Sequence, residues 1–336
     1  MKGRHPTPRR ARRLDRIDGC FQLLPTRFVA RYYAFVKASV VTAYGGPEVM
    51  KYQDMPDPKP GAGDVVVRVA GIGINPEDML ERNGVIKGWQ LQFPAIIGLD
   101  VSGTVVAMGD GVTDLTVGER VCGWSYHTYA ELVADKANVF AKVPGTMDLV
   151  EAAAIPLAGV TGSQLISVAS GVQSGQTVLV SGAAGAVGRC AVYVAKVLGA
   201  RVIAGVRRFQ LAQAGNIGAD ETIALDDPAA FAAIPQVDVV ANTVRGKTAT
   251  DLLTKVKDGG TFASVTGEPD GTKDHPKVRV VPFVSKQDRA AIAFIADAVN
   301  AGKMTIPIGL CERLEEAGAA QAAFTKGGIG KVLLVP

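Results

Sequence analysis

The sequence TVLVSGAAGAVGRCAVYVAKVLGARVIAGVRR, residues 177–208, has the pattern of a strand, a tight turn, a helix and a second strand. Residues 177–180 form a short, mostly β-branched run of the kind that is buried on both faces of a parallel sheet. Apolar residues then recur at helical spacing over residues 186–198, Gly199 predicts the helix end, and residues 202–206 supply the next strand. The stretch therefore predicts a βαβ unit.

The turn of this unit, AAGAVG at residues 183–188, occupies the six positions of a dinucleotide-binding fingerprint, with alanine in place of the first glycine. Small residues let the backbone approach a pyrophosphate, and the free N–H groups at the helix N-terminus favour its negative charge. A tight turn that binds nothing would have the same pattern, but the two flanking strands favour a nucleotide site. The predicted cofactor contacts are Ala184, Gly185, Ala186, Val187 and Gly188.

The second strand of the unit ends in Arg207 and Arg208. Enzymes that use NAD usually carry a carboxylate here for the ribose 2′-OH, whereas enzymes that use NADP carry a cation. Two guanidiniums suit a 2′-phosphate, and the sequence shows no competing carboxylate near the strand end. We therefore expect NADPH as the cofactor; the alternative is that both arginines are ordinary surface charges.

Length and composition indicate a two-domain α/β protein in which the chain after residue 36 is not strongly charged. A chain of 336 residues exceeds one ordinary core, and 39 glycines with only 6% aromatic residues fit an α/β fold with many tight turns. Residues 1–36 contain nine Lys or Arg and two Asp, so the net charge of +4 comes from this segment. Nucleic-acid binding by the rest of the chain is not implied.

The cysteines and the longest uncharged stretch bear on the compartment. The four cysteines, Cys20, Cys122, Cys190 and Cys311, include no CxxC pair, so we expect no disulfide framework, no cysteine-rich zinc lobe and a reducing, cytoplasmic setting. Residues 152–188 carry no charge, but prolines, glycines and glutamines interrupt them. The stretch is interpreted as protein interior, with no membrane span.

Residues 1–36 are interpreted as an N-terminal extension. They are basic and interrupted by proline, and they lack the continuous apolar stretch of an export signal. The β-strand pattern begins at Lys37, which favours a dispensable leader with Val36 as an alternative start codon; a basic arm that binds acidic surfaces is the other interpretation.

The rest of the chain divides into β-rich and α/β regions. Short β patterns at residues 38–42, 65–69, 101–107, 120–122 and 129–133 predict a small antiparallel barrel-like domain. Helical sequence starts near Leu149, and βαβ units follow to Phe283, with later strands at residues 237–241 and 261–265. Helices are expected at residues 286–301 and 314–324, and a last strand at residues 331–335.

Several segments, in order, resemble the medium-chain dehydrogenase/reductase superfamily, in its zinc-free quinone oxidoreductase (zeta-crystallin-like) branch. They are KASVVTAYGGPEV (37–49), GINPEDMLERNG (73–84), GLDVSGTVVAMGDGVTDLTVGERV (98–121), EAAAIPLAGVTG (151–162), IGAD (217–220), VDVVANTV (237–244) and GGIGKVLLV (327–335). The resemblance covers residues 37–336. It implies a GroES-like catalytic domain (residues 37–157 and 284–336) around a Rossmann NADP-binding domain (residues 158–283), an active site between the two, and a homodimer.

The resemblance also indicates that a catalytic zinc is missing. Zinc-dependent relatives have GHE where this chain has Gly98, Leu99 and Asp100, and a cysteine ligand within the segment that here is GIGINP. The histidines, at positions 5, 127 and 275, are not spaced as metal pairs. Without a Lewis acid, an acceptor that takes hydride readily is favoured, such as a quinone or an α,β-unsaturated ketone.

Asn75 and Thr161 match family positions that line the site. The resemblance places Asn75 near nicotinamide and substrate, where its amide would donate to a developing oxyanion; the alternative is a turn in which Asp78 caps a helix. Thr161 matches a residue against the nicotinamide, although a threonine at a helix start is commonly only a cap.

Further site residues follow from the aromatic cluster and the strand ends. Tyr126 or His127 is expected as a substrate-side wall, whereas Tyr129 is expected to be packing; water can deliver the proton equally well. The ends of the later strands predict contacts from Thr243, Val265 and Gly267. Relatives often carry a tyrosine near adenine where this chain has Leu225, and a lysine that this chain lacks, so the NADPH prediction depends on the two arginines.

The sequence thus predicts an NADPH-dependent, zinc-independent reductase of quinones or enones. Two alternatives stay open: reduction of enoyl thioesters, and a non-catalytic NADPH-binding protein with a structural or regulatory role.

Overall fold

The computed structural model describes residues 35–336 except residues 87, 89 and 329. The predicted extension therefore lies almost entirely outside the described residues. Strand β1 begins at Phe35, two residues before the predicted start at Lys37, because Phe35 and Val36 pair with Pro56 and Met55 of the neighbouring strand.

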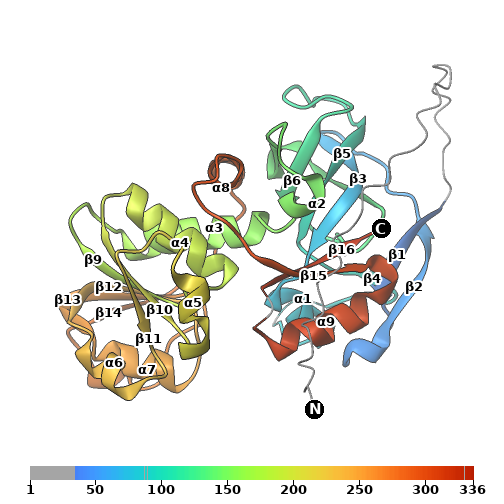
Figure 1. Cartoon of the computed structure of the whole chain (residues 1–336). Helices are drawn as coiled ribbons and strands as arrows, with labels where there is room; N and C mark the ends of the chain where they lie inside the picture. The colour runs from blue at the N-terminus through green and yellow to red at the C-terminus, as the bar shows by residue number, and fades with distance from the viewer. Residues whose placement is uncertain (1–34, 87, 89, 329) are drawn as a thin grey trace, which may run out of the picture. The chain divides into compact units, whose positions relative to one another are not determined.

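Along the chain, a β-rich part is followed by an α/β part, and the last strands return to the β-rich part (Figure 1). The strands are β1 Phe35–Val41, β2 Met50–Pro56, β3 Asp64–Gly73, β4 Ala95–Ile96, β5 Asp100–Met108, β6 Arg120–Trp124, β7 Leu132–Lys136, β8 Phe140–Lys142, β9 Thr177–Ser181, β10 Arg201–Val206, β11 Glu221–Ala224, β12 Val237–Asn242, β13 Val256–Ser264, β14 Arg279–Pro282, β15 Ile308–Arg313 and β16 Lys331–Val335. The helices are α1 Pro76–Arg82, α2 Leu149–Ala152, α3 Pro156–Gln164, α4 Ala186–Val197, α5 Leu211–Ala214, α6 Pro228–Ala233, α7 Lys247–Leu253, α8 Arg289–Asn300 and α9 Ala317–Lys326.

The α/β part is a doubly wound parallel sheet. Its strand order is β11-β10-β9-β12-β13-β14, and every neighbouring pair is parallel. The chain starts at β9 in the middle, moves outward to β11, and then crosses to β12 on the other side. In sheets of this order, ligands bind at the carboxyl ends of the strands where the direction of winding reverses, which here is between β9 and β12.

The predicted βαβ unit forms because its two apolar patterns are buried against each other. Val178 and Val180 of β9 are fully buried and share one core cluster with Cys190 and Ala191 of α4. Residues 190, 191, 194 and 195 recur at helical spacing and give α4 one buried face. The prediction of a Rossmann domain is confirmed.

The β-rich part contains two sheets and includes the C-terminal strand. One sheet has the order β15-β16-β3-β5-β6-β8, with β7 also paired to β3, and the other has the order β2-β1-β4. Alternate residues of β3, such as Val65 and Val67, are fully buried in the core between these elements. Strand β16 pairs with β3 through Leu333 and Gly73, so the end of the chain completes the GroES-like fold.

Two strand predictions were wrong in position. The strand expected at residues 129–133 is β7, Leu132–Lys136, because Tyr129 is held by a hydrogen bond from its N–H to Ile97 O (3.0 Å) in a connecting segment. Strand β13 begins at Val256 rather than Thr261, and it passes through Gly259 and Gly260 with a register irregularity opposite β12. A glycine pair predicts a turn, so the sequence does not indicate the first half of this strand.

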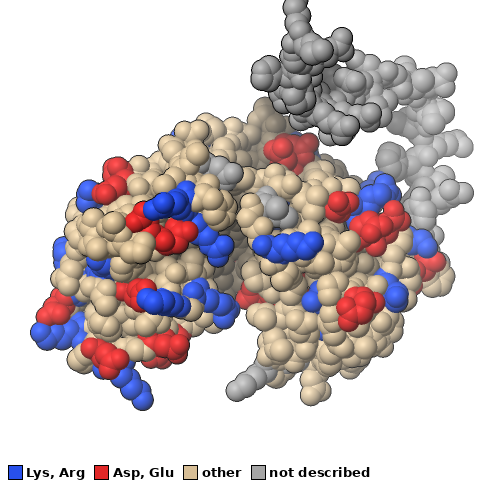
Figure 2. All heavy atoms as spheres, turned by 60° about the horizontal axis from the view of Figure 1, so that its bottom comes forward, with Lys and Arg blue, Asp and Glu red and all other residues tan. Residues whose placement is uncertain are grey.

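The surface of the described residues has mixed charge. On the face shown in Figure 2, Lys and Arg side chains are interspersed with Asp and Glu. No helix within the described ranges is both long and apolar enough to cross a bilayer.

Candidate functional site

The fingerprint turn needs its glycines for reasons visible in the backbone. Gly182 has a φ of +64°, and a Cβ there would lie 2.3 Å from Thr243 Oγ1. A Cβ on Gly188 would lie 2.3 Å from Gly182 O. The first fingerprint position is occupied by the buried Ala183, and its N–H donates to Gly205 O (3.1 Å), which joins the turn to β10.

The N-terminus of α4 fits an anionic group. Its N-cap, Gly185, has no side chain and makes no side-chain capping hydrogen bond. The first turn of a helix leaves such N–H groups without intrahelical partners, and the helix dipole adds positive potential. The residues present therefore fit the pyrophosphate of a dinucleotide, with Ala184, Gly185, Ala186, Val187 and Gly188 around it.

Arg189 binds the fingerprint turn through a backbone carbonyl. This contact was not predicted from the sequence. Its side chain is buried, and Nε donates to Ala184 O (3.1 Å) while Nη1 donates to Thr305 Oγ1 (3.3 Å). Burial lowers the pKa of its guanidinium from the usual value. The sequence signal was a charged residue within the buried, apolar face of the helix.

A buried polar network joins the carboxyl ends of β9, β12 and β13. The fully buried Asn242 accepts a hydrogen bond from Ser181 Oγ (2.7 Å) and donates to Ser264 Oγ (3.0 Å) and Thr266 Oγ1 (3.2 Å). Thr243 is fixed by its own bonds to Ser181, Oγ1 to O (2.7 Å) and N–H to Oγ (3.0 Å). The network brings the predicted contact Thr243 beside the fingerprint turn.

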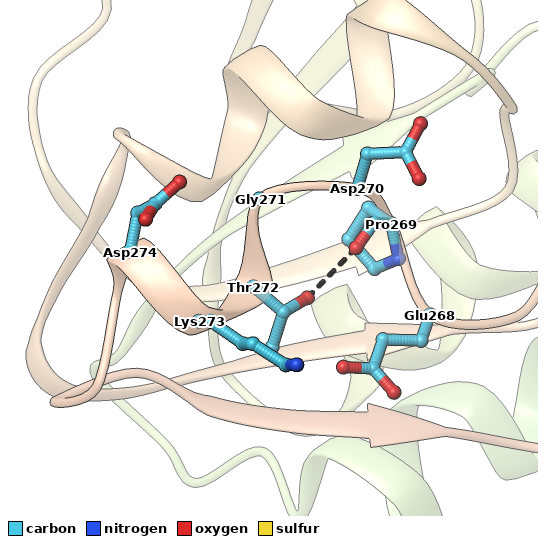
Figure 3. A pocket seen from close by; sticks show the side chains of 7 residues that line it. All are labelled: Glu268, Pro269, Asp270, Gly271, Thr272, Lys273 and Asp274. Atoms are coloured by element: carbon cyan, nitrogen blue, oxygen red, sulfur yellow. Dashed lines mark hydrogen bonds between the residues drawn. The ribbon is translucent and has the colours of Figure 1, made fainter.

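The predicted contacts Val265 and Gly267 follow directly after β13. The Val265 N–H donates to Asn242 O (3.2 Å), so this segment is tied to the same network. The loop after Gly267 borders an open hollow of about 460 Å³ that is lined by residues 268–274 alone (Figure 3). Thr272 Oγ1 donates to Pro269 O (2.8 Å) across this loop, whereas Asp270 and Asp274 lie at its opposite ends. None of the predicted site residues lines the hollow.

Thr161 lies within α3 rather than at its start, so it is not a helix cap. The next residue, Gly162, lets α3 approach α4 closely, since a Cβ there would lie 2.6 Å from Val187 O. Thr161 is buried, and its hydroxyl is 2.9 Å from Ser285 Oγ. The contact at Gly162 places α3, which carries Thr161, against the first turn of α4.

The two arginines after β10 differ in their contacts, and the expectation that no carboxylate near the strand end competes was wrong for Arg208. Arg208 donates from its backbone N–H to Asp226 Oδ1 (2.7 Å), and its guanidinium forms an ion pair with Asp227. Both carboxylates follow β11, which lies beside β10 in the sheet. Because Asp226 and Asp227 are distant from Arg208 in the sequence, their proximity in space was not predicted.

Asn75 is the N-cap of α1 and belongs to a buried cluster with Asp100 and Lys331. Its Nδ2 donates to Gly73 O (3.1 Å) and to Asp100 Oδ2 (2.9 Å), and its Oδ1 accepts from Lys331 Nζ (2.7 Å). An ammonium only donates, so these contacts determine the orientation of the amide. Both amide hydrogens are engaged within the protein, and donation to a substrate oxygen requires one of them to change partner.

Asp78 also caps α1, as the alternative interpretation held. Its Oδ2 accepts from the Asn75 N–H (2.9 Å) and from the Tyr129 hydroxyl (2.8 Å). Burial raises the pKa of Asp78 to about 8. Tyr129 is fully buried, in agreement with the packing role expected for it.

Tyr126 and His127 lie in the connection after β6. Tyr126 is 38% exposed, which leaves part of its ring accessible. His127 has a φ of +59°, unusual for a residue with a side chain, and its Nδ1 lies 2.8 Å from Ile96 O. The imidazole is therefore anchored to β4.

The described residues contain no group of three or more His, Cys, Asp or Glu side chains arranged to hold a metal. Leu99, which stands where zinc-dependent relatives have the histidine of GHE, is apolar and buried.

Comparison with known proteins relates both parts of the chain to dehydrogenases. Residues 61–146 match the family described as alcohol dehydrogenase GroES-like domain, and residues 217–334 match the family described as zinc-binding dehydrogenase. The 2-haloacrylate reductase of a Burkholderia species is 30% identical over 90% of this chain and 99% of its own. The chloroplast envelope quinone oxidoreductase homolog of Arabidopsis thaliana is 26% identical over 87% of this chain and 95% of its own. The solved structure of the quinone oxidoreductase from Coxiella burnetii superposes with a TM-score of 0.81 at 25% identity, over 90% of this chain and 99% of the other.

Proposed function

The chain belongs to the medium-chain dehydrogenase/reductase superfamily, in its quinone oxidoreductase branch, and from that premise we propose that it is an NADPH-dependent, zinc-independent reductase of a quinone or an α,β-unsaturated carbonyl compound. The observation that carries the proposal is the uncapped N-terminus of α4 behind a turn in which Gly182 and Gly188 tolerate no Cβ. A turn so constrained leaves its N–H groups free for a dinucleotide pyrophosphate.

The choice of NADPH rests on Arg207 and Arg208 at the end of β10. A guanidinium binds a phosphate dianion through two parallel hydrogen bonds, and β10 ends on the side of the sheet where the adenosine ribose of a dinucleotide lies. The carboxylates nearest the strand end, Asp226 and Asp227, are engaged with Arg208 and with backbone N–H groups. Asp227, which accepts hydrogen bonds through both of its oxygens, is therefore not a free acceptor for a ribose hydroxyl.

The choice of acceptor rests on the residues that replace a zinc site. Leu99 supplies no lone pair, and Asn75 and Asp100 are bound to the Lys331 ammonium at 2.7 and 2.8 Å. These side chains do not form a tetrahedral N and S donor set of the kind that holds catalytic zinc. A substrate that accepts hydride without a Lewis acid, such as a quinone or an enone, suits this site. The names of the quinone oxidoreductases and of the 2-haloacrylate reductase agree with such acceptors.

In the proposed mechanism, the reduced nicotinamide supplies the hydride when it is bound. The first-turn N–H groups of α4 hold the pyrophosphate, Thr161 limits the position of the nicotinamide, and Thr243, Val265 and Gly267 flank its ribose. Asn75 stabilises the developing oxyanion after exchange of one of its internal hydrogen bonds, and Tyr126 forms the wall beside the acceptor. A proton reaches the product oxygen from Tyr126, His127 or water. We also propose a homodimer, which light scattering of the purified protein tests.

The test is NADPH oxidation with three acceptors in parallel: a simple quinone, an enone and an enoyl thioester. Turnover with the quinone or the enone, and a much lower kcat/KM with NADH, is the expected result. Turnover with the thioester alone would favour an enoyl-thioester reductase. Tight NADPH binding without turnover of any acceptor would favour a binding protein.

A further inference from the structure

Arg207 and Arg208 are adjacent in the chain but differ in their surroundings. The Arg208 guanidinium is held by Asp227, and its backbone N–H by Asp226. The Arg207 backbone N–H donates to Gln210 Oε1 (3.1 Å), whereas its guanidinium makes no hydrogen bond or ion pair with any residue in the described ranges. One of the two cations is therefore engaged and the other is available.

Asp227 is bound through both carboxylate oxygens. Oδ1 accepts from the N–H groups of Ala229 (2.9 Å) and Ala230 (3.1 Å) at the start of α6, and Oδ2 accepts from Arg208. These backbone bonds and the ion pair with Arg208 lower the pKa of Asp227, so it is ionised at neutral pH. The helix fixes this carboxylate, and the carboxylate in turn restrains Arg208.

The adenosine end of the predicted cofactor site lies beside these residues. The Ala183 N–H of the fingerprint turn donates to Gly205 O, two residues before Arg207. On the other side, the Leu225 N–H donates to Val206 O (2.8 Å), and the Leu225 side chain fills the space where a Cβ on Gly205 would lie, at 2.7 Å. Arg207 is thus the first residue beyond the sheet, between the turn and the segment after β11.

We propose that Arg207 alone recognises the ribose 2′-phosphate, and that Asp227 retains Arg208 and thereby sets how strongly the site prefers a phosphorylated ribose. The proposal rests on the proposed function, because it assigns roles within the same cofactor site. A guanidinium that already binds a carboxylate gains little by exchanging it for a phosphate, and the carboxylate repels the phosphate.

The experiment measures Kd by calorimetry for two probes, adenosine 2′,5′-bisphosphate and adenosine 5′-monophosphate, with the full chain. The ratio of the two Kd values isolates the contribution of the 2′-phosphate. Arg207→Ala is expected to reduce the preference for the bisphosphate by about 10- to 100-fold, the loss typical of a charge-assisted hydrogen bond. Arg208→Ala is expected to change it by less than about 3-fold, as for a solvent-exposed ion pair.

Asp227→Asn is the decisive variant. Asparagine retains the side-chain oxygen that caps α6 and is as good an N-cap as aspartate. The substitution removes the negative charge and releases Arg208, so the preference for the bisphosphate is expected to rise by about 3- to 10-fold. An unchanged Kd for the monophosphate shows that the adenosine site of each variant is intact.

Arg201→Ala is the matched control, because Arg201 lies at the other end of β10 in an exposed ion pair with Glu221. It should leave both Kd values unchanged. Loss of preference in Arg208→Ala equal to that in Arg207→Ala, or no gain in Asp227→Asn, overturns the inference while the NADPH reductase proposal stands. A wild-type protein that binds both probes equally overturns the NADPH assignment itself and, with it, the roles given to the arginines.

Discussion

The ammonium of Lys331 lies 2.8 Å from Oδ2 of Asp100, and the two side chains are only 4% and 0% exposed. The same oxygen accepts from Asn75, and the other oxygen of Asp100 accepts from the Leu157 N–H at the start of α3 (2.7 Å). The ion pair therefore connects β16, β5, α1 and the helix that carries Thr161. Buried charges are tolerated only when they are paired and hydrogen-bonded, and this pair satisfies both conditions.

Replacing one member of the pair should destabilise the protein strongly. Lys331→Met leaves Asp100 as an unpaired buried charge, which costs about 3–5 kcal/mol in the free energy of unfolding. The double variant Lys331→Met, Asp100→Asn removes both charges, retains an acceptor for the Leu157 N–H, and should recover part of this loss. Urea denaturation of the single and double variants measures the difference.

The exposed pair between Lys277 and Asp258 provides the control, since both side chains are more than 70% exposed (73% and 74%). Lys277→Met should change stability by less than about 1 kcal/mol. Equal effects of Lys331→Met and Lys277→Met would contradict the conclusion that Lys331 and Asp100 depend on each other as a buried charged pair.

Asp78 should make the stability depend on pH. Its pKa is raised to about 8 by burial and, more weakly, by Asp100, although the Asn75 N–H, the Tyr129 hydroxyl and Lys331 act in the opposite direction. The unfolded chain has a value of about 4 for this group. The folded state therefore keeps the proton between pH 4 and pH 8 while the unfolded state loses it, and stability falls as pH rises through this interval, by roughly 1 kcal/mol per pH unit.

Asp78→Asn tests this dependence because the amide cannot ionise. The difference in unfolding free energy between Asp78→Asn and the wild type should shift in favour of the variant as the pH is raised from 5 to 8. Effects of other titrating groups cancel in this difference. A difference that stays constant over the same interval would show that Asp78 titrates at its ordinary pKa.

Gly188→Ala should abolish tight cofactor binding. The added Cβ would lie 2.3 Å from Gly182 O, so the fingerprint turn must move away from α4. We expect NADPH to bind at least about 10-fold more weakly and stability to fall by about 1–3 kcal/mol. Gly215→Ala makes the same chemical change where φ is −59° and no atom lies within 4 Å, so it should leave NADPH affinity unchanged. Equal NADPH affinities in both variants would refute the role of this turn.

Local patterns were sufficient to predict the dinucleotide-binding unit. β9, α4 and β10 follow one another directly, and each has the apolar period of its own secondary structure. The glycine turn could be placed because its requirements are those of the backbone. By contrast, β2 was not predicted, since its sequence MKYQDMP alternates weakly and no residue in it is buried.

The partners of the site residues could not be predicted, because they are distant in the sequence. Lys331 is 231 residues from Asp100, and Asp227 is 19 residues from Arg208, after a strand whose position had not been recognised. A lysine at the start of an apolar C-terminal strand does not indicate which carboxylate will be its ion-pair partner. Such contacts depend on the order of strands in the sheet rather than on any local pattern.

The cysteines should differ sharply in reactivity, and this tests how tightly α3 packs on α4. Burial raises the pKa of both Cys122 and Cys190 to about 12, and a Cβ on Gly162 would lie 2.6 Å from the Cβ of Cys190. Thiolates are the reactive form, so both residues should resist alkylation in the native protein at pH 8 and react fully in urea. The exposed Cys311 should react in the native state, although partial burial raises its pKa as well. Peptide mapping after iodoacetamide treatment distinguishes the sites, and native labelling of Cys190 as fast as that of Cys311 would mean that α3 does not hold Thr161 against the first turn of α4.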